Sequence, residues 1–216
     1  MPLLDDITRD LDWRESEIAS MRLLLLRRDL SAKQRQALLR SAWALLYAHY
    51  EGFCKNCLTL FFAEISRLGV RCSDLPSATK EFALRGAIKH MRSLSDNDLV
   101  TEIVEFPTTH LQANPSFPDV DTGSNLWPDK LVGLMSLADL NTQTVSRHAT
   151  KLSTLVARRN GIAHGEKNFI AEFAYYHSFE EAVYDVIYDL AIQVEDRLND
   201  APYRYHAEQS SVPLAG

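Results

Sequence analysis

An arginine and a histidine separated by four residues are the side chains of this sequence best suited to chemistry. Arg159 and His164 lie in the run RRNGIAHG, residues 158–165, and Asn160 follows the arginine directly. Cleavage of RNA by transesterification needs a base that takes the proton of the ribose 2′-hydroxyl, and histidine, with an ordinary pKa of about 6.5, suits this task. It also needs a cation where negative charge develops on the phosphate, and the fixed fork of arginine suits that task. The run therefore predicts RNA cleavage that requires no metal ion, with Asn160 orienting either group or the phosphate.

The spacing alone is a weak signal, because Arg85 and His90 have the same separation. The surroundings distinguish the two pairs. On the helix predicted before the motif, Arg159 falls on the apolar face, where a guanidinium is costly unless it is paired or used to bind an anion. We expect Gly161 and Gly165 to break that helix, and the break at Gly161 to place His164 beside Arg159. The other pair lies within one uninterrupted helix and is predicted to have no chemical role.

Two questions about this helix stay open at the level of sequence. Arg159 can instead satisfy free carbonyls at the helix C-terminus, with His164 as a capping or core residue. Arg147, Lys151 and Arg158 form a separate polar stripe, which is either a contact for the RNA backbone or a solvated face.

The elements that must position these residues are predicted to be helices, and no stretch alternates as a strand does. An amphipathic helix is predicted over 4–29. A longer one is predicted over 32–68, beginning with a capping box of Ser31 and Gln34 and ending at Gly69. Further helices are predicted over 77–91, 96–105, 141–160 and 178–198, with Ser77, Asn141 and Ser178 as N-caps.

Residues 107–129 interrupt this helical pattern. They hold four of the eight prolines together with a glycine and several Asn and Asp residues, which predicts a long irregular insertion. The fold class is therefore all-α, a bundle of four to five main helices. We expect an N-terminal amphipathic helix over 1–30 packed on the bundle, a helical domain over 31–200 and a flexible tail over 201–216.

The helix over 32–68 is apolar on more sides than one bundle is expected to cover. We therefore predict a homodimer, in which apolar seams and two Arg159–His164 pairs meet at a two-fold axis. Glu51 flanks the seam of this helix and is expected to lie partly buried beside a cation, either Arg159 or His164. The alternatives are a solvated Glu51 or a pairing with Lys55, four residues further along the helix.

Composition limits the cellular setting and the ligands. The net charge is −6, so RNA binding must come from a local basic patch. Three cysteines are too few for a disulfide framework and fit a reducing cytoplasm. Cys54 and Cys57 form a CxxC pair, but no second pair completes a zinc site, and we predict neither a metal nor another cofactor. No apolar run is long enough to cross a membrane, so a soluble protein is expected.

The two informative segments resemble those of a known family. The run RRNGIAHG resembles the signature of the HEPN superfamily, and YAHYEGFCK, residues 47–55, resembles a stand-alone prokaryotic branch found in defence and toxin–antitoxin settings. The resemblance covers roughly residues 35–200, with no counterpart for the insertion. It implies a dimeric helical bundle that faces two motifs across one cleft and cleaves RNA without a metal, leaving a cyclic phosphate. It also implies that Arg159, Asn160 and His164 are the catalytic motif.

The prediction is therefore an endoribonuclease that acts as a toxin or anti-phage defence effector, with RNA as substrate and an antitoxin or other neutralising protein as a possible partner. The alternative is a non-catalytic HEPN-like module that binds a protein or a nucleotide and in which the arginine is structural. A third interpretation, a helical regulatory scaffold, lacks a DNA-reading helix of basic character.

Overall fold

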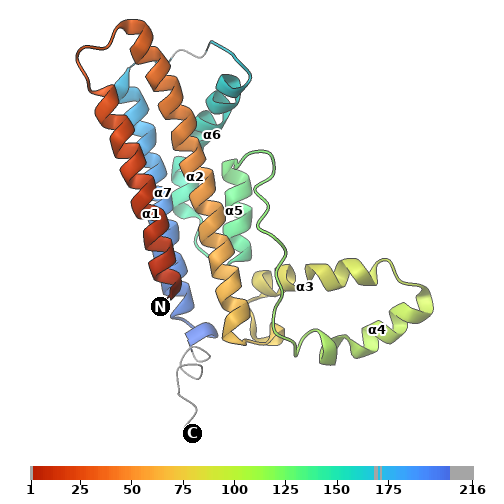
Figure 1. The fold of residues 1–216 in the computed structure, drawn as a ribbon. Helices are drawn as coiled ribbons and strands as arrows, with labels where there is room; N and C mark the ends of the chain where they lie inside the picture. Colours follow the sequence, from red (N-terminus) through yellow and green to blue (C-terminus); the bar gives the residue numbers. More distant parts are fainter. Residues whose placement is uncertain (1, 168–169, 171, 205–216) are drawn as a thin grey trace. The chain divides into compact units, whose positions relative to one another are not determined.

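The computed structural model describes residues 2–167, 170 and 172–204, and in this part of the chain every regular element is helical (Figure 1). This confirms the all-α prediction. None of the described helices is long and apolar enough to cross a membrane. The α-helices are α1 (Pro2–Leu25), α2 (Ala32–Leu68), α3 (Ser77–Met91), α4 (Asp96–Thr109), α5 (Pro128–Leu137), α6 (Gln143–Ala163) and α7 (Phe173–Leu198).

The ends of α2 lie where the local signals predicted them. The backbone N–H of Ser31 donates to Oε1 of Gln34 at 2.9 Å, and the N–H of Gln34 donates to Oγ of Ser31 at 3.3 Å, which is the predicted capping box. At the other end Gly69 has φ of 74°, a left-handed conformation that glycine adopts without strain.

Three other predicted caps are wrong. Ser77 is the first residue of α3 and forms no side-chain cap. The helix α6 begins at Gln143, and Asn141 instead exchanges hydrogen bonds of 2.6 and 3.0 Å with the side chain of Gln193. The helix α7 begins at Phe173, five residues before Ser178, because its apolar stripe extends back to the buried ring of Tyr176.

The irregular segment is shorter than predicted at both ends and spans residues 110–127. The helix α4 continues to Thr109, with Pro107 in its last turn. The helix α5, which was not predicted, begins at Pro128, and proline is well suited to the first turn because the N–H there needs no helical partner. Its Leu131 and Met135 are buried, so burial of an apolar face holds this short helix in place.

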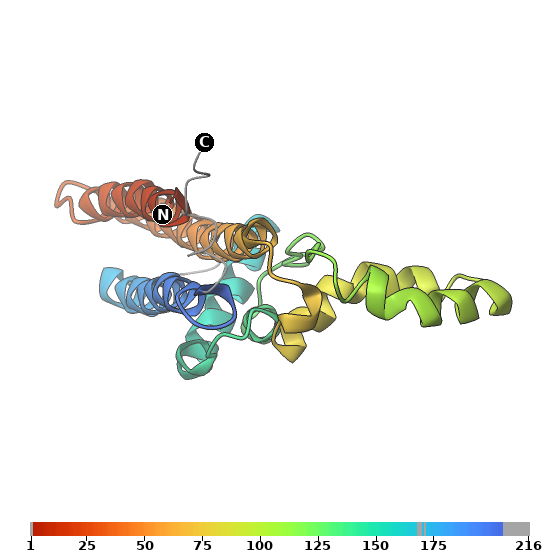
Figure 2. The ribbon, with the colours of Figure 1, turned by 90° about the horizontal axis from the view of Figure 1, so that it is seen from below.

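The chain forms two compact units. Unit 1 consists of residues 1–57, 121–133 and 142–192. In it α1, the first part of α2 and α7 lie side by side (Figures 1 and 2). The helix α1 contacts both neighbours: Glu17 lies 2.9 Å from Nε2 of His49 on α2, and Arg22 forms an ion pair of 3.1 Å with Glu180 of α7. Unit 1 contains all the predicted site residues.

Unit 2 consists of residues 58–120, 134–141 and the chain from 193 onward. Its core includes an aromatic cluster in which the ring of Phe62 lies 5.0 Å from Phe82 and 4.8 Å from Phe117. Tyr203 is fully buried against Phe61, so the prediction of a loose tail from residue 201 is wrong at this position. The rest of the predicted tail, from residue 205, lies outside the described residues.

The apolar surface of α2 is covered within a single chain. Trp43, Tyr47, Phe53 and Phe61 are fully buried, and none of the described large apolar side chains that remain exposed belongs to α2. Residues 32–57 of α2 contribute to unit 1 and the remainder to unit 2. The helix is apolar on several sides because it serves two cores, so the argument from α2 for a second subunit does not hold.

Candidate functional site

The C-terminal end of α6 carries the predicted motif, and the helix continues through Gly161 to Ala163, with Gly165 just beyond its end. Gly161 is buried inside the helix, and His164 is the C-cap. The N–H of Gly165 donates to the carbonyl of Ile162 at 3.1 Å and the N–H of Glu166 donates to that of Gly161 at 2.9 Å, the bonding pattern of a Schellman motif. Gly165 has φ of 81°, as this motif requires. The predicted break at Gly161 is therefore wrong.

Arg159 points into unit 1 and is held by neutral groups. Its Nη1 donates to Oδ1 of Asn125 at 2.9 Å and to Oδ1 of Asn160 at 3.0 Å. The guanidinium carbon lies 4.4 Å from the centroid of the Tyr47 ring. In the described part of the chain Arg159 forms no ion pair, so its positive charge is oriented without being neutralised by a carboxylate.

Tyr47 links Arg159 to the irregular segment and to Glu51. Its hydroxyl accepts the backbone N–H of Leu126 at 2.9 Å, and Leu126 is fully buried. Burial raises the pKa of Tyr47 to about 12. The hydrogen bond from Leu126 opposes this shift, Glu51 adds to it through its charge and a hydrogen bond, and the nearby Arg159 lowers it. The phenol therefore stays protonated at neutral pH.

Glu51 thus reaches the arginine through the hydroxyl of Tyr47 and not directly. Among the described residues it forms no ion pair with Arg159 or His164, so the expected direct pairing with a cation is wrong.

His164 is exposed at the C-cap and shares no hydrogen bond with Arg159. At 3.6 residues per turn, two residues five apart project about 140° from each other around the helix axis. With no break at Gly161, the arginine points inward while the histidine lies at the surface. Within one chain the two predicted catalytic side chains therefore leave α6 in different directions.

The predicted basic stripe of α6 is used largely in packing. The guanidinium of Arg158 lies 5.3 Å from the ring of Trp43 and 5.0 Å from that of Tyr175. Lys151 donates from Nζ to the carbonyl of Ser178 at 2.9 Å, and Arg147 is exposed. The sequence left two alternatives for this stripe, an RNA contact or a solvated face. Of the three side chains, only Arg147 is exposed as a solvated face requires.

The segment 47–55 of α2 serves two sides of unit 1. Tyr47 and Glu51 belong to the site, whereas His49 and Gly52 face α1. A Cβ on Gly52 would lie 2.9 Å from Nη1 of Arg14, so the glycine makes room for this guanidinium. His49 is buried between Arg14 and Glu17; burial lowers its pKa, and Glu17 opposes that shift.

Two residues of the site were missed in the sequence. Asn125 lies in the irregular segment, where composition indicates a loop but no periodicity indicates which side chain faces inward. Tyr47 stood in a recognised segment, but its alignment with Arg159 depends on how α2 and α6 pack. The second pair, Arg85 and His90, is exposed on α3 in unit 2.

The CxxC residues are part of the core. Cys54 and Cys57 are buried free thiols, and burial raises the pKa of both. Among the described residues no three His, Cys, Asp or Glu side chains are grouped so as to hold a metal ion.

Comparison with known proteins gives a match that includes both segments contributing to the site, one on α2 and one at the end of α6. A family model described as HEPN_MAE_28990-like HEPN matches residues 3–203, which include the α2 segment and the end of α6. No curated protein and no solved structure gives a significant match.

Proposed function

Because the chain belongs to the HEPN_MAE_28990-like HEPN family, we propose that it is an endoribonuclease that cleaves RNA by attack of a ribose 2′-hydroxyl without a metal ion. His164 takes the proton of the attacking hydroxyl, and Arg159 stabilises the charge on the phosphate. As the bond from phosphorus to the 5′-oxygen breaks, that oxygen takes a proton from water, so the products carry a 2′,3′-cyclic phosphate and a 5′-hydroxyl.

The observation that carries this proposal is the setting of Arg159. An arginine that only stabilises a fold is usually paired with a carboxylate when it is partly buried. Here two amide oxygens and a tyrosine ring fix the guanidinium, and Nε and Nη2 have no acceptor among the described residues. The guanidinium is thus held in one orientation, has no carboxylate partner and can still donate hydrogen bonds. Such a group suits a phosphate whose negative charge grows during the reaction.

The separation of His164 from Arg159 supports a site shared by two copies of the chain, as the family resemblance implies. Each copy would supply one of the two side chains to a given phosphate. Two arginines brought together in this way would also provide a local positive region despite the net charge of −6.

The cellular role we propose is that of a cytoplasmic toxin or anti-phage defence effector, with an antitoxin or another protein as its neutralising partner. The family resemblance supports this role.

The test is a cleavage assay with end-labelled RNA in the presence of EDTA. We expect cleavage to persist in EDTA, the products to carry cyclic phosphates, and His164→Ala to abolish the activity. Loss of activity in EDTA and its return with magnesium would contradict the mechanism.

A second candidate function rests on the hydrogen bond from Arg159 to Asn125, which ties α6 to the irregular segment. If that is its purpose, the chain is a non-catalytic module that binds a protein or a nucleotide. Arg159→Ala would then lower the melting temperature of a protein that has no cleavage activity to lose.

A further inference from the structure

The helices α3 and α4 form a hairpin in unit 2 and expose an unusual amount of apolar surface (Figure 1). The helix α4 buries none of its residues. Val100, Ile103 and Val104 are 63%, 54% and 74% exposed. These three positions step by three and four, so they form a stripe along one face of the helix. A contiguous exposed apolar stripe of this kind indicates a surface that binds another molecule.

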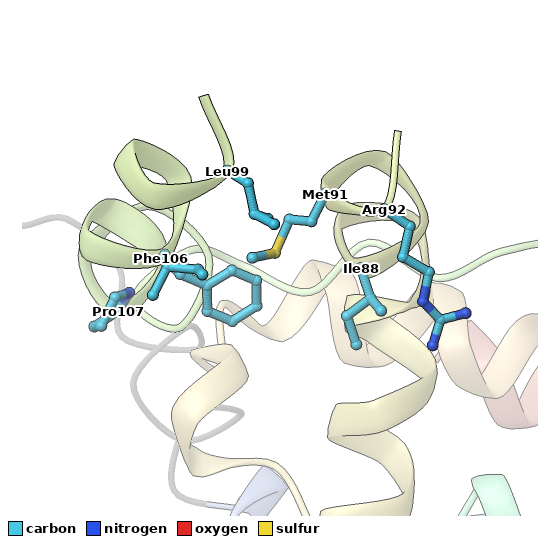
Figure 3. A pocket seen from close by; sticks show the side chains of 7 residues that line it. Ile88, Met91, Arg92, Leu99, Phe106 and Pro107 are labelled. Carbon is cyan, nitrogen blue, oxygen red and sulfur yellow. The ribbon is translucent and has the colours of Figure 1, made fainter. Parts of the chain in front are cut away.

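The stripe borders a groove of about 510 Å³ between the two helices. In Figure 3 Met91 from α3 and Leu99 and Phe106 from α4 point toward one another across it. Ile88, Ile103 and Pro107 complete the apolar lining, and Arg92 is the single charged side chain there. A groove with this lining fits an apolar helix face.

The two helices that form the groove carry opposite charge. The helix α3 and its C-cap hold four lysines and arginines and one glutamate, whereas α4 holds four carboxylates and no lysine or arginine. At the tip of the hairpin, Arg92 lines the groove from α3. Asp96, four residues before Val100 and therefore on the same stripe, is the first residue of α4 and so lies at the same end of the hairpin. Both side chains are exposed.

We propose that this groove binds the same groove of a second copy of the chain, so that two hairpins form a four-helix bundle. A two-fold rotation exchanges the walls, which places Arg92 of each copy against Asp96 of the partner subunit. The apolar stripes then close over the two grooves. A partner helix that carried only one sign of charge would meet like charge on either α3 or α4. The surface therefore favours a second copy of this chain over such a partner.

This contact is argued from unit 2 alone and does not rest on the chemistry proposed for α6. It is a second contact between identical chains, separate from the proposed site that two copies would share through Arg159 and His164.

The full chain tests it by sedimentation equilibrium over a range of micromolar concentrations. Val104→Asp buries an unpaired carboxylate in the bundle, and we expect it to raise the dissociation constant by about 100-fold. Thr101→Asp adds the same charge to an exposed position of the same helix and should change the constant much less. Both positions are exposed in the single chain, so circular dichroism should show both variants folded.

A charge exchange tests the pairing of the walls. Arg92→Glu and Asp96→Arg should each weaken self-association by about 10-fold, because like charges then meet at the tip. Mixing the two variants should restore it, since opposite charges face each other at both contacts of the mixed pair. A monomeric native chain, or a dimer that Val104→Asp leaves unchanged, would overturn the proposal, and so would a mixture no tighter than either variant alone.

Discussion

Arg159 is fixed in unit 1 by the amide oxygens of Asn125 and Asn160 and by the ring of Tyr47, all of them neutral groups. A carboxylate in the same place would bind the arginine more tightly but would cancel the field that an incoming phosphate experiences. Neutral acceptors orient the guanidinium and leave its charge available. Glu51 acts one step away, on the hydroxyl of Tyr47.

We expect Arg159→Ala and His164→Ala each to lower the rate of RNA cleavage by about 10²- to 10⁴-fold, as removal of a catalytic base or of an electrostatic stabiliser does. The His164 variant should keep its native stability, because that side chain is exposed. Arg85→Ala and His90→Ala are the matched controls, with the same spacing on α3, and should retain full activity. Similar losses in both pairs would show that the wrong motif had been chosen.

Asn125 is a positioning residue in this scheme. Asn125→Ala removes one of the two amide acceptors of Arg159, so we expect kcat to fall by about 10-fold while the affinity for RNA changes little. Asn125→Asp, which places a negative charge beside the guanidinium, should reduce cleavage further. Ser124→Ala, at the exposed neighbouring position, is the control. Equal kinetics in all three variants would remove Asn125 from the site.

At the residue scale the sequence predicted the inward face of Arg159 but not the partners of the arginine. Periodicity assigns a face to a residue on a helix, and for Arg159 that assignment agrees with the structure. It says nothing about an irregular segment, so the place of Asn125 could not be found. The position of His164 was predicted wrongly because Gly161 was expected to break α6, whereas the helix continues through Gly161 to Ala163.

At the scale of elements, boundaries were predictable where a reciprocal bond or a left-handed glycine defines them. The capping box of Ser31 and Gln34 and the glycine at position 69 define both ends of α2. A serine alone is a weaker signal, as Ser178 shows: it lies inside α7 and donates its hydroxyl to the carbonyl of Tyr175. The short helix α5 was hidden because proline-rich sequence precedes it.

The end of α6 gives a stability test. Gly165→Ala forces a side chain into φ of 81°, and we expect it to lower the free energy of unfolding by about 1 kcal/mol. Gly86→Ala, within α3, meets nothing within 4 Å and should instead raise it by up to about 1 kcal/mol. Urea unfolding of the two variants measures both changes. Equal effects would mean that α6 does not end in the left-handed turn at Gly165.

At the scale of the whole molecule, the apolar surface of α2 was assigned to a subunit interface, yet it lies in the two cores of one chain. A sequence does not reveal where a long helix passes from one core to the next, so burial on several sides has two explanations. The apolar residues that do remain exposed on α4 lie in a helix whose amphipathic pattern was too short to analyse in the sequence. The case for a second copy therefore rests on α4 and on the separation of Arg159 from His164.

That separation can be tested by mixing two inactive variants. If a site takes Arg159 from one copy and His164 from the other, a mixed dimer of Arg159→Ala and His164→Ala contains one intact site and one that lacks both groups. Random exchange makes half of the dimers mixed, so about a quarter of the native activity should return. Arg159→Ala mixed with the double variant Arg159→Ala/His164→Ala is the control and should stay inactive, because no arginine is present in any combination. If both residues act within one chain, no mixture regains activity. RNA cleavage after equilibration of the subunits therefore distinguishes a shared site from two independent ones.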